Sequence, residues 1–198
     1  MYRWRKMNAD QRKETLARRK LQPHPQHSPR HHKEGKGLYL ITATCYEHRP
    51  WICASDLRMD QFSSALLEVL ANHAMRIDAW VVLPNHYHAL VLTDSCPALL
   101  RELGRLHGRS SFQWNREDDS RGRKVWFNSL EREISGDAHH IAAIHYVHHN
   151  PVKHGYVKRR DEWKWSSAAE YLERLGREEV ERRWKEYPLL NFGVGWDE

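Results

Sequence analysis

The sequence predicts an α+β fold, in which a ferredoxin-like (split βαβ) antiparallel sheet carries helices on one face. Three observations lead to this class. From Leu38 onward, segments rich in β-forming residues alternate with segments of helical hydrophobic period in the order β-α-β-β-α-β-α. The length of 198 residues suits one domain with extensions. The hydrophobic fraction of 40% is enough to build a core.

The first half of the pattern contains three strands and one helix. Residues 38–46, "LYLITATCY", are rich in β-forming side chains and predict the first strand. Residues 55–75 show apolar side chains at helical spacing after an N-cap candidate, Ser55 or Asp56. The segments 76–83 and 86–93 are apolar and predict two further strands, joined by a turn at Pro84-Asn85.

The second half contains two helices and a weaker strand. Residues 97–114 have a helical pattern that Gly104 and Gly108 weaken, and residues 124–133 predict a strand. The last helix is expected from Asp137 to Asn150, since Pro151 disfavours helical geometry in the residue before it.

Charge and composition divide the chain into three parts. Residues 1–36 form a Pro/His-rich arm with 11 Lys+Arg and 3 Asp+Glu, a net charge of +8, and carry a possible short helix near residues 10–20. The remainder has 21 basic and 23 acidic residues, a net charge of −2. We therefore predict a basic arm (1–36), a core domain (37–170) and a C-terminal tail (171–198). A basic arm is typical of polyphosphate binding, although a solubilising tail has the same composition.

The composition also limits the class of protein. No apolar run approaches the roughly 18 residues that a membrane-spanning helix requires, and the N-terminal residues show no secretory h-region. The three cysteines, Cys45, Cys53 and Cys96, have no CxxC spacing, which argues against a disulfide framework or a thiolate zinc site. We expect a cytoplasmic protein without membrane association.

Two histidines share one face of the third predicted strand. In "PNHYHAL", His86 and His88 are two residues apart, so that both point to one side of the sheet while Tyr87 points to the other. An HxH pair alone is more often structural than metal-binding, and a catalytic metal site needs a third protein ligand.

The last predicted helix offers further chemistry. Tyr146 and Asn150 are four residues apart and therefore lie on one helix face. His145 and His149 have the same spacing, but Tyr146 stands where the zinc-protease motif HExxH requires glutamate. A phenol and an amide oxygen on one face suit attack on a phosphoryl group polarised by a metal. The other histidines of this helix are expected at the surface or in packing roles.

Three motifs together carry a family resemblance. "LPNHYHALV", "YVHHNPVKHGYV" and "WKWSS" occur in the order found in the single-tyrosine HUH transposase superfamily, and within it the chain resembles the REP-associated tyrosine transposases of bacteria. The resemblance extends over about two-thirds of the chain, from Leu38 to Ser167. It implies the same ferredoxin-like fold, with the tyrosine helix against the sheet face that carries the histidines.

The resemblance also implies a site and a reaction. His86, His88 and Asn150 would hold a divalent metal, Mg²⁺ or Mn²⁺, and Tyr146 would be the nucleophile. The substrate would be single-stranded or hairpin DNA of repeated extragenic palindromes (REP), cut and rejoined through a 5′-phosphotyrosine intermediate. We expect a monomer rather than a dimer, associated with the nucleoid when bound to DNA.

Basic residues outside these motifs are candidates for contacts with DNA phosphates. They lie in the N-terminal arm, in the predicted helix 97–114 and after the tyrosine helix: Arg3, Arg5, Lys6, Arg18, Arg19, Lys20, Arg105, Lys153 and Lys158. Arg105 belongs to a stripe with Arg101 and Arg109 that is equally consistent with a solvated face. Trp163 and Trp165 suit an anchor of the C-terminal segment better than stacking on bases.

Two alternative functions remain at this point. The chain could be the transposase of an autonomous insertion element, which shares the chemistry and differs in genomic context. It could also be a hairpin-binding regulator without catalysis, although no structural requirement accounts for the combination of His86, His88, Tyr146 and Asn150.

Overall fold

A computed structural model describes Asn8, Asp10, Gln11 and residues 35–189. Four antiparallel strands form one sheet in the order β2-β3-β1-β4. The strands are β1 (Gly37–Cys45), β2 (Arg76–Val82), β3 (His86–Thr93) and β4 (Trp126–Ile134). The predicted arm residues Arg3, Arg5, Lys6, Arg18, Arg19 and Lys20 lie outside the described residues.

The connections confirm the predicted ferredoxin-like class. Helix α3 (Asp56–His73) links β1 to β2, and α4 (Cys96–Glu117) links β3 to β4. Each helix therefore crosses between two strands that another strand separates in the sheet. Ser55 caps α3 by accepting a hydrogen bond of 3.1 Å from the Arg58 N–H, as the N-cap pattern predicts.

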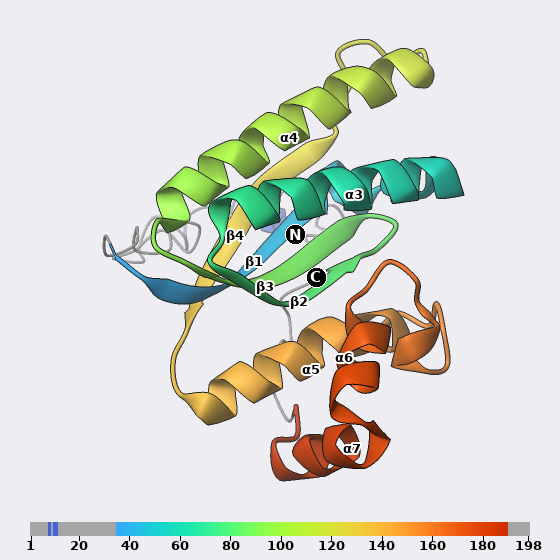
Figure 1. The fold of residues 1–198 in the computed structure, drawn as a ribbon. Helices are drawn as coiled ribbons and strands as arrows, with labels where there is room; N and C mark the ends of the chain where they lie inside the picture. The colour runs from blue at the N-terminus through green and yellow to red at the C-terminus, as the bar shows by residue number, and fades with distance from the viewer. Residues whose placement is uncertain (1–7, 9, 12–34, 190–198) are drawn as a thin grey trace.

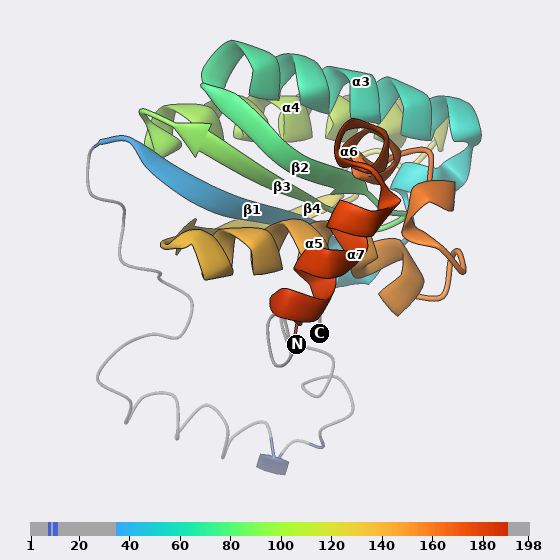
Figure 2. The ribbon, with the colours of Figure 1, turned by 60° about the horizontal axis from the view of Figure 1, so that its bottom comes forward.

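Helices cover both faces of the sheet. Figure 1 shows α3 and α4 on one face and α5 (Asp137–Lys153) on the other, with α6 (Ala168–Leu175) and α7 (Arg177–Glu186) beyond α5. The helices that the fold class places on one face are α3 and α4, and α5 lies against the face of the histidines, as the resemblance implies. Figure 2 shows the sheet enclosed between these layers.

Strand alternation separates two apolar cores. Tyr39, Ile41 and Ala43 of β1 point toward α3 and α4, whereas Leu40 between them packs with residues of α5. The core beside α5 also contains Tyr171 of α6 and Val180 of α7. The predicted domain boundary at residue 170 therefore falls inside α6, whose buried side chains continue the same core.

Helix α5 is one turn longer than predicted. It continues through Pro151 to Lys153, not to Asn150. The His154 N–H donates to the Asn150 carbonyl at 3.1 Å, and the Tyr156 N–H donates to the Pro151 carbonyl at 2.9 Å. These two hydrogen bonds stabilise the turn that contains Pro151. The proline removes only one backbone N–H donor, near the end of the helix. Asn150 is consequently held on a helical turn.

The segment after α5 is anchored on the edge strand β2. The Val82 N–H donates to the Trp165 carbonyl at 2.8 Å, and the indole N–H of Trp163 donates to the Val82 carbonyl at 2.8 Å. The indole N–H of Trp165 donates to Asp60 Oδ1, also at 2.8 Å. Both tryptophans thus lie where the predicted anchoring role places them.

The Ser167 hydroxyl joins this anchor to α5, and its removal is expected to destabilise the fold. Ser167 Oγ accepts the Trp80 N–H at 2.9 Å and shares a hydrogen bond of 2.9 Å with His148 Nε2. Ser167→Ala leaves both buried groups without this partner, so we expect the free energy of unfolding to fall by about 1–3 kcal/mol. Urea denaturation measures this change. Ser111→Ala is the control. Among the described residues its hydroxyl bonds only the His107 carbonyl of the same helix, so its loss should cost less than about 0.5 kcal/mol.

His107 makes the stability of the fold sensitive to acid. Its ring stacks on Trp126 with centroids 4.3 Å apart, and burial lowers its pKa to about 4. In the unfolded chain the pKa of the His107 imidazole is near 6.5. Between about pH 6.5 and pH 4 the unfolded chain therefore binds a proton at His107 that the folded chain does not. Stability is therefore full above about pH 6.5 and is lost as the pH falls toward 4.

Thermal unfolding between pH 7 and pH 4 tests this dependence. In His107→Gln the side-chain amide can still accept from the Tyr87 hydroxyl, which lies 3.1 Å from His107 Nε2 in the wild type. We expect the fall in Tm below pH 6.5 to be shallower in this variant. An equally steep fall would assign the acid sensitivity to other groups.

Candidate active site

The HxH motif begins the central strand β3. His86 and His88 are 1% and 0% exposed and face α5, whereas Tyr87 packs in the core beside α3 and α4. The two imidazole centroids are 5.0 Å apart with the rings nearly perpendicular. The alternation predicted from the i, i+2 spacing is confirmed.

Tyr146 and Asn150 of α5 face these histidines. The Tyr146 ring lies edge-on to the His88 ring with centroids 5.0 Å apart, and Asn150 Oδ1 lies 3.1 Å from His86 Nε2. Tyr146 is 2% exposed and Asn150 is fully buried. The structure thus brings together the four residues that the sequence selects as catalytic and metal-binding.

A hydrogen-bond chain determines which nitrogen of His86 carries its proton. The Asn85 amide N–H donates to the His48 carbonyl at 3.1 Å, which turns Asn85 Oδ1 toward His86 Nδ1 at 2.7 Å. Because Oδ1 can only accept, Nδ1 must be the donor. The Nε2 lone pair of a neutral His86 ring then points at the Asn150 amide.

His86 Nε2 and Asn150 Oδ1 lie close enough to bind one cation together. The cis ligands of an octahedral ion with bonds of about 2.1 Å lie about 3.0 Å apart, close to the observed His86–Asn150 distance of 3.1 Å. Asn150 Nδ2 is buried and has no hydrogen-bond partner within the described part of the chain. The donor set of two imidazoles and one amide oxygen therefore fits a divalent metal.

The cross-strand neighbour of His88 is a second part of this arrangement. Thr42 pairs with His88 in the β1–β3 register, and Thr42 Oγ1 lies 2.7 Å from His88 Nδ1. A hydrogen bond to the second ring nitrogen is typical of histidines that bind metals, because it fixes the ring orientation. Among residues 35–189, no group of three or more His, Cys, Asp and Glu side chains is arranged to hold a metal. A site here depends on the Asn150 amide.

The predicted basic residues fall in different places. Lys153 Nζ lies 5.4 Å from the Tyr146 ring centroid, and Lys158 is exposed in the loop that follows. Arg105 lies on the exposed side of α4, where it pairs with Glu102 at 2.6 Å. Since α4 and α5 cover opposite faces of the sheet, Arg105 is not part of the arrangement around Tyr146 (Figure 1).

Sequence reasoning missed Asn85, Thr42 and the position of His154. The sequence predicts only a turn at Asn85, although an Asn directly before a histidine can bond its ring. The Thr42 contact needs the strand register, which no local pattern specifies. The His154 ring lies 5.1 Å from the His86 ring, at the edge of the site.

The chain is 25% identical over 135 residues to the REP-associated tyrosine transposase of Escherichia coli K12, covering 66% of this chain and 76% of that protein. The chain has a homologue among the REP-associated tyrosine transposases. The resemblance predicted from the motifs is thereby confirmed.

A solved structure supports the fold of this transposase homologue. The chain resembles the solved structure of a REP-associated tyrosine transposase bound to a REP hairpin, with a TM-score of 0.57 and 22% identity. The match covers 74% of this chain and 85% of the other. No protein-family model matches the chain. Within the described residues, no helix is long and apolar enough to cross a membrane.

Proposed function

We propose that the protein is a metal-dependent endonuclease and strand transferase for single-stranded DNA, acting on REP-type hairpins through a 5′-phosphotyrosine intermediate. One observation carries this proposal. A tyrosine and an amide from one helix face two imidazoles of the central strand, with Tyr146 against His88 and Asn150 against His86. The homology to a REP-associated transposase supports a DNA substrate of the hairpin class.

The buried donors His86, His88 and Asn150 would hold Mg²⁺ or Mn²⁺. When bound, the ion would withdraw charge from the scissile phosphate and so favour nucleophilic attack on it. Asn85 and Thr42 would orient the two imidazoles through their Nδ1 atoms.

Tyr146 would make the covalent link. Attack of its phenol oxygen forms a bond to phosphorus and breaks the bond to the 3′ oxygen, so that one strand carries the protein at its 5′ phosphate and the other ends in a 3′-hydroxyl. The phenol loses a proton and the departing 3′ oxygen gains one. The link conserves the phosphodiester bond energy, which permits a hydroxyl from another strand to reverse the step and join DNA.

Lys153 is positioned to assist this step. Its ammonium group lies on the Tyr146 ring side of α5 and is exposed, so that it can reach a phosphate bound beside the tyrosine. A cation at this place would favour both the approach of DNA and the loss of the phenol proton.

The test is formation of a covalent adduct. The full chain is incubated with a labelled REP-type hairpin oligonucleotide and Mg²⁺ or Mn²⁺, then separated under denaturing conditions. We expect a labelled protein band that disappears when EDTA is added before the DNA. Tight hairpin binding without any adduct, in either metal, would instead indicate a regulator that binds DNA without cutting it.

A further inference from the structure

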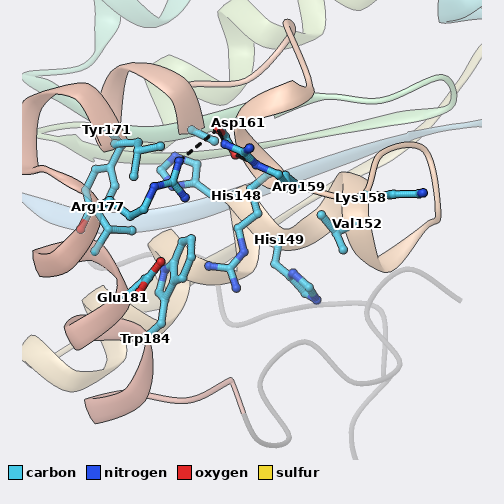
Figure 3. Close-up of a pocket in the computed structure, with 14 residues that line it drawn as sticks. His148, His149, Val152, Lys158, Arg159, Asp161, Tyr171, Arg177, Glu181 and Trp184 are labelled. Carbon is cyan, nitrogen blue, oxygen red and sulfur yellow. Dashed lines mark hydrogen bonds and ion pairs between the residues drawn. The ribbon is translucent and has the colours of Figure 1, made fainter.

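A cavity lies on the other side of the tyrosine helix, away from the HxH motif. It has a volume of about 390 Å³ and is lined by residues of α5, η3 (Arg160–Glu162), α6 and α7. Figure 3 shows His148 and His149 of α5 and Glu181 and Trp184 of α7 around it. The volume is within the range of small-ligand sites, roughly 300–1,000 Å³.

Arg160 is the unusual group in this cavity. Its guanidinium carbon lies 3.0 Å from the Trp184 ring centroid, and its Nη1 is buried with no hydrogen-bond partner in residues 35–189. Burial lowers the pKa of Arg160 to about 10, so the side chain is still charged at neutral pH. A desolvated cation without a counter-ion is costly, and such groups are normally paired.

The carboxylates of the cavity do not supply this counter-ion. Asp161 pairs with Arg159, and Arg177 lies 3.8 Å from the same carboxylate. Four cations, Lys158, Arg159, Arg160 and Arg177, line the cavity with only two acids, Asp161 and Glu181. His149 Nδ1 is also buried without a hydrogen-bond partner in the described chain. The cavity therefore offers excess positive charge and donors to an anion.

We propose that this cavity binds a phosphate group, with Arg160 as its main ligand and Lys158 at its rim. A guanidinium presents several N–H donors in a planar fork that matches phosphate oxygens, and Trp184 holds that fork in place. The phosphate has two possible sources, a backbone phosphodiester of DNA or a free compound such as a mononucleotide. The DNA source rests on the proposed function: Lys153, beside Tyr146, ends α5, and the loop that follows leads to Lys158 at the cavity.

Thermal unfolding of the full chain tests the site itself. Wild type and variants are compared in sodium phosphate and in sodium chloride of equal pH and ionic strength. We expect phosphate to raise the Tm of the wild type by roughly 3 °C at ten times its Kd. Arg160→Gln should lose this gain, whereas Arg105→Gln, which removes an exposed cation on the far face of the sheet, should retain it.

Two results would contradict the proposed phosphate site. One is a wild-type Tm that phosphate does not raise above its value in chloride, and the other is an equal rise in Arg160→Gln. If Arg160→Gln does not fold, Lys158→Gln decides, since Lys158 is exposed and its replacement leaves the core intact. If phosphate raises the Tm of Lys158→Gln by half the wild-type amount or less, the site is supported. An unchanged rise in Tm contradicts it.

Two further probes separate the sources. Binding of a fluorescent ten-nucleotide oligothymidylate and of dTMP is measured for Arg160→Gln and Arg105→Gln. A loss of fivefold or more in oligonucleotide affinity that is specific to Arg160→Gln assigns the phosphate to DNA. A loss confined to dTMP and inorganic phosphate assigns it to a free compound. Tyr146→Phe should keep the phosphate gain, so the failure of this site and the failure of the cleavage proposal give different results.

Discussion

Tyr146→Phe is expected to reduce covalent adduct formation with a hairpin oligonucleotide by about 10³-fold or more. The substitution removes the only atom that can form the phosphotyrosine bond while it keeps the ring that lies against His88. Hairpin affinity should change by less than about threefold, because phosphate contacts come from other side chains. The adduct is measured on denaturing gels and the affinity by fluorescence anisotropy.

Tyr156→Phe provides a matched control. Tyr156 lies in the loop after α5, is 43% exposed and stacks on Trp163 with centroids 5.4 Å apart. It is therefore a second phenol near the site, and among the described residues its ring pairs with Trp163 and His154 rather than with His86 or His88. We expect normal adduct formation in Tyr156→Phe. An adduct that survived in Tyr146→Phe and vanished in Tyr156→Phe would transfer the nucleophile to the loop.

The second large effect concerns the metal. His86→Ala removes one imidazole and leaves Asn150 Oδ1 without the partner at 3.1 Å. In the wild type, Mn²⁺ bound to the proposed site is expected to raise the Tm without DNA. In His86→Ala we expect this rise to disappear and adduct formation in Mn²⁺ to fall by at least about 100-fold. Both readouts are needed, because the rise in Tm requires no DNA and reports the metal directly.

His154→Ala is the control for this experiment. The His154 ring lies 5.1 Å from His86 and is exposed, so the variant removes a neighbouring imidazole that is not in the proposed donor set. It should retain the Mn²⁺-dependent rise in Tm. If His86→Ala kept both the rise and the adduct, the assignment of His86 as a ligand would be wrong.

The fold class was predictable because its signals are local. The strands and helices follow from hydrophobic period and capping, as the match of Ser55 to the start of α3 shows. The error at Pro151 has a local cause as well, since a proline penalises one turn but does not forbid it when the following N–H groups find helical acceptors. Hydrophobic periodicity alone could not predict that α5, α6 and α7 cover the second face of the sheet. Periodicity identifies the apolar side of an element but not the element that packs against it.

The site was predictable in part for the same reason. His86 and His88 share a face through the strand period, and Tyr146 and Asn150 share a face through the helix period. Their meeting was implied by the family resemblance. The contacts that orient them, from Thr42 and Asn85, depend on the β1–β3 register and on the turn before β3.

The sequence by itself determined which side chains share an element and a direction: paired imidazoles on one strand, and a phenol above an amide on one helix. Only the tertiary structure decided the distances between these elements, the tautomer of His86 and the burial of the Arg160 guanidinium against Trp184. The physical reason is range. Backbone periodicity acts over a few residues, whereas the charge and hydrogen-bond balance of a buried group depends on side chains that packing brings together from distant parts of the chain.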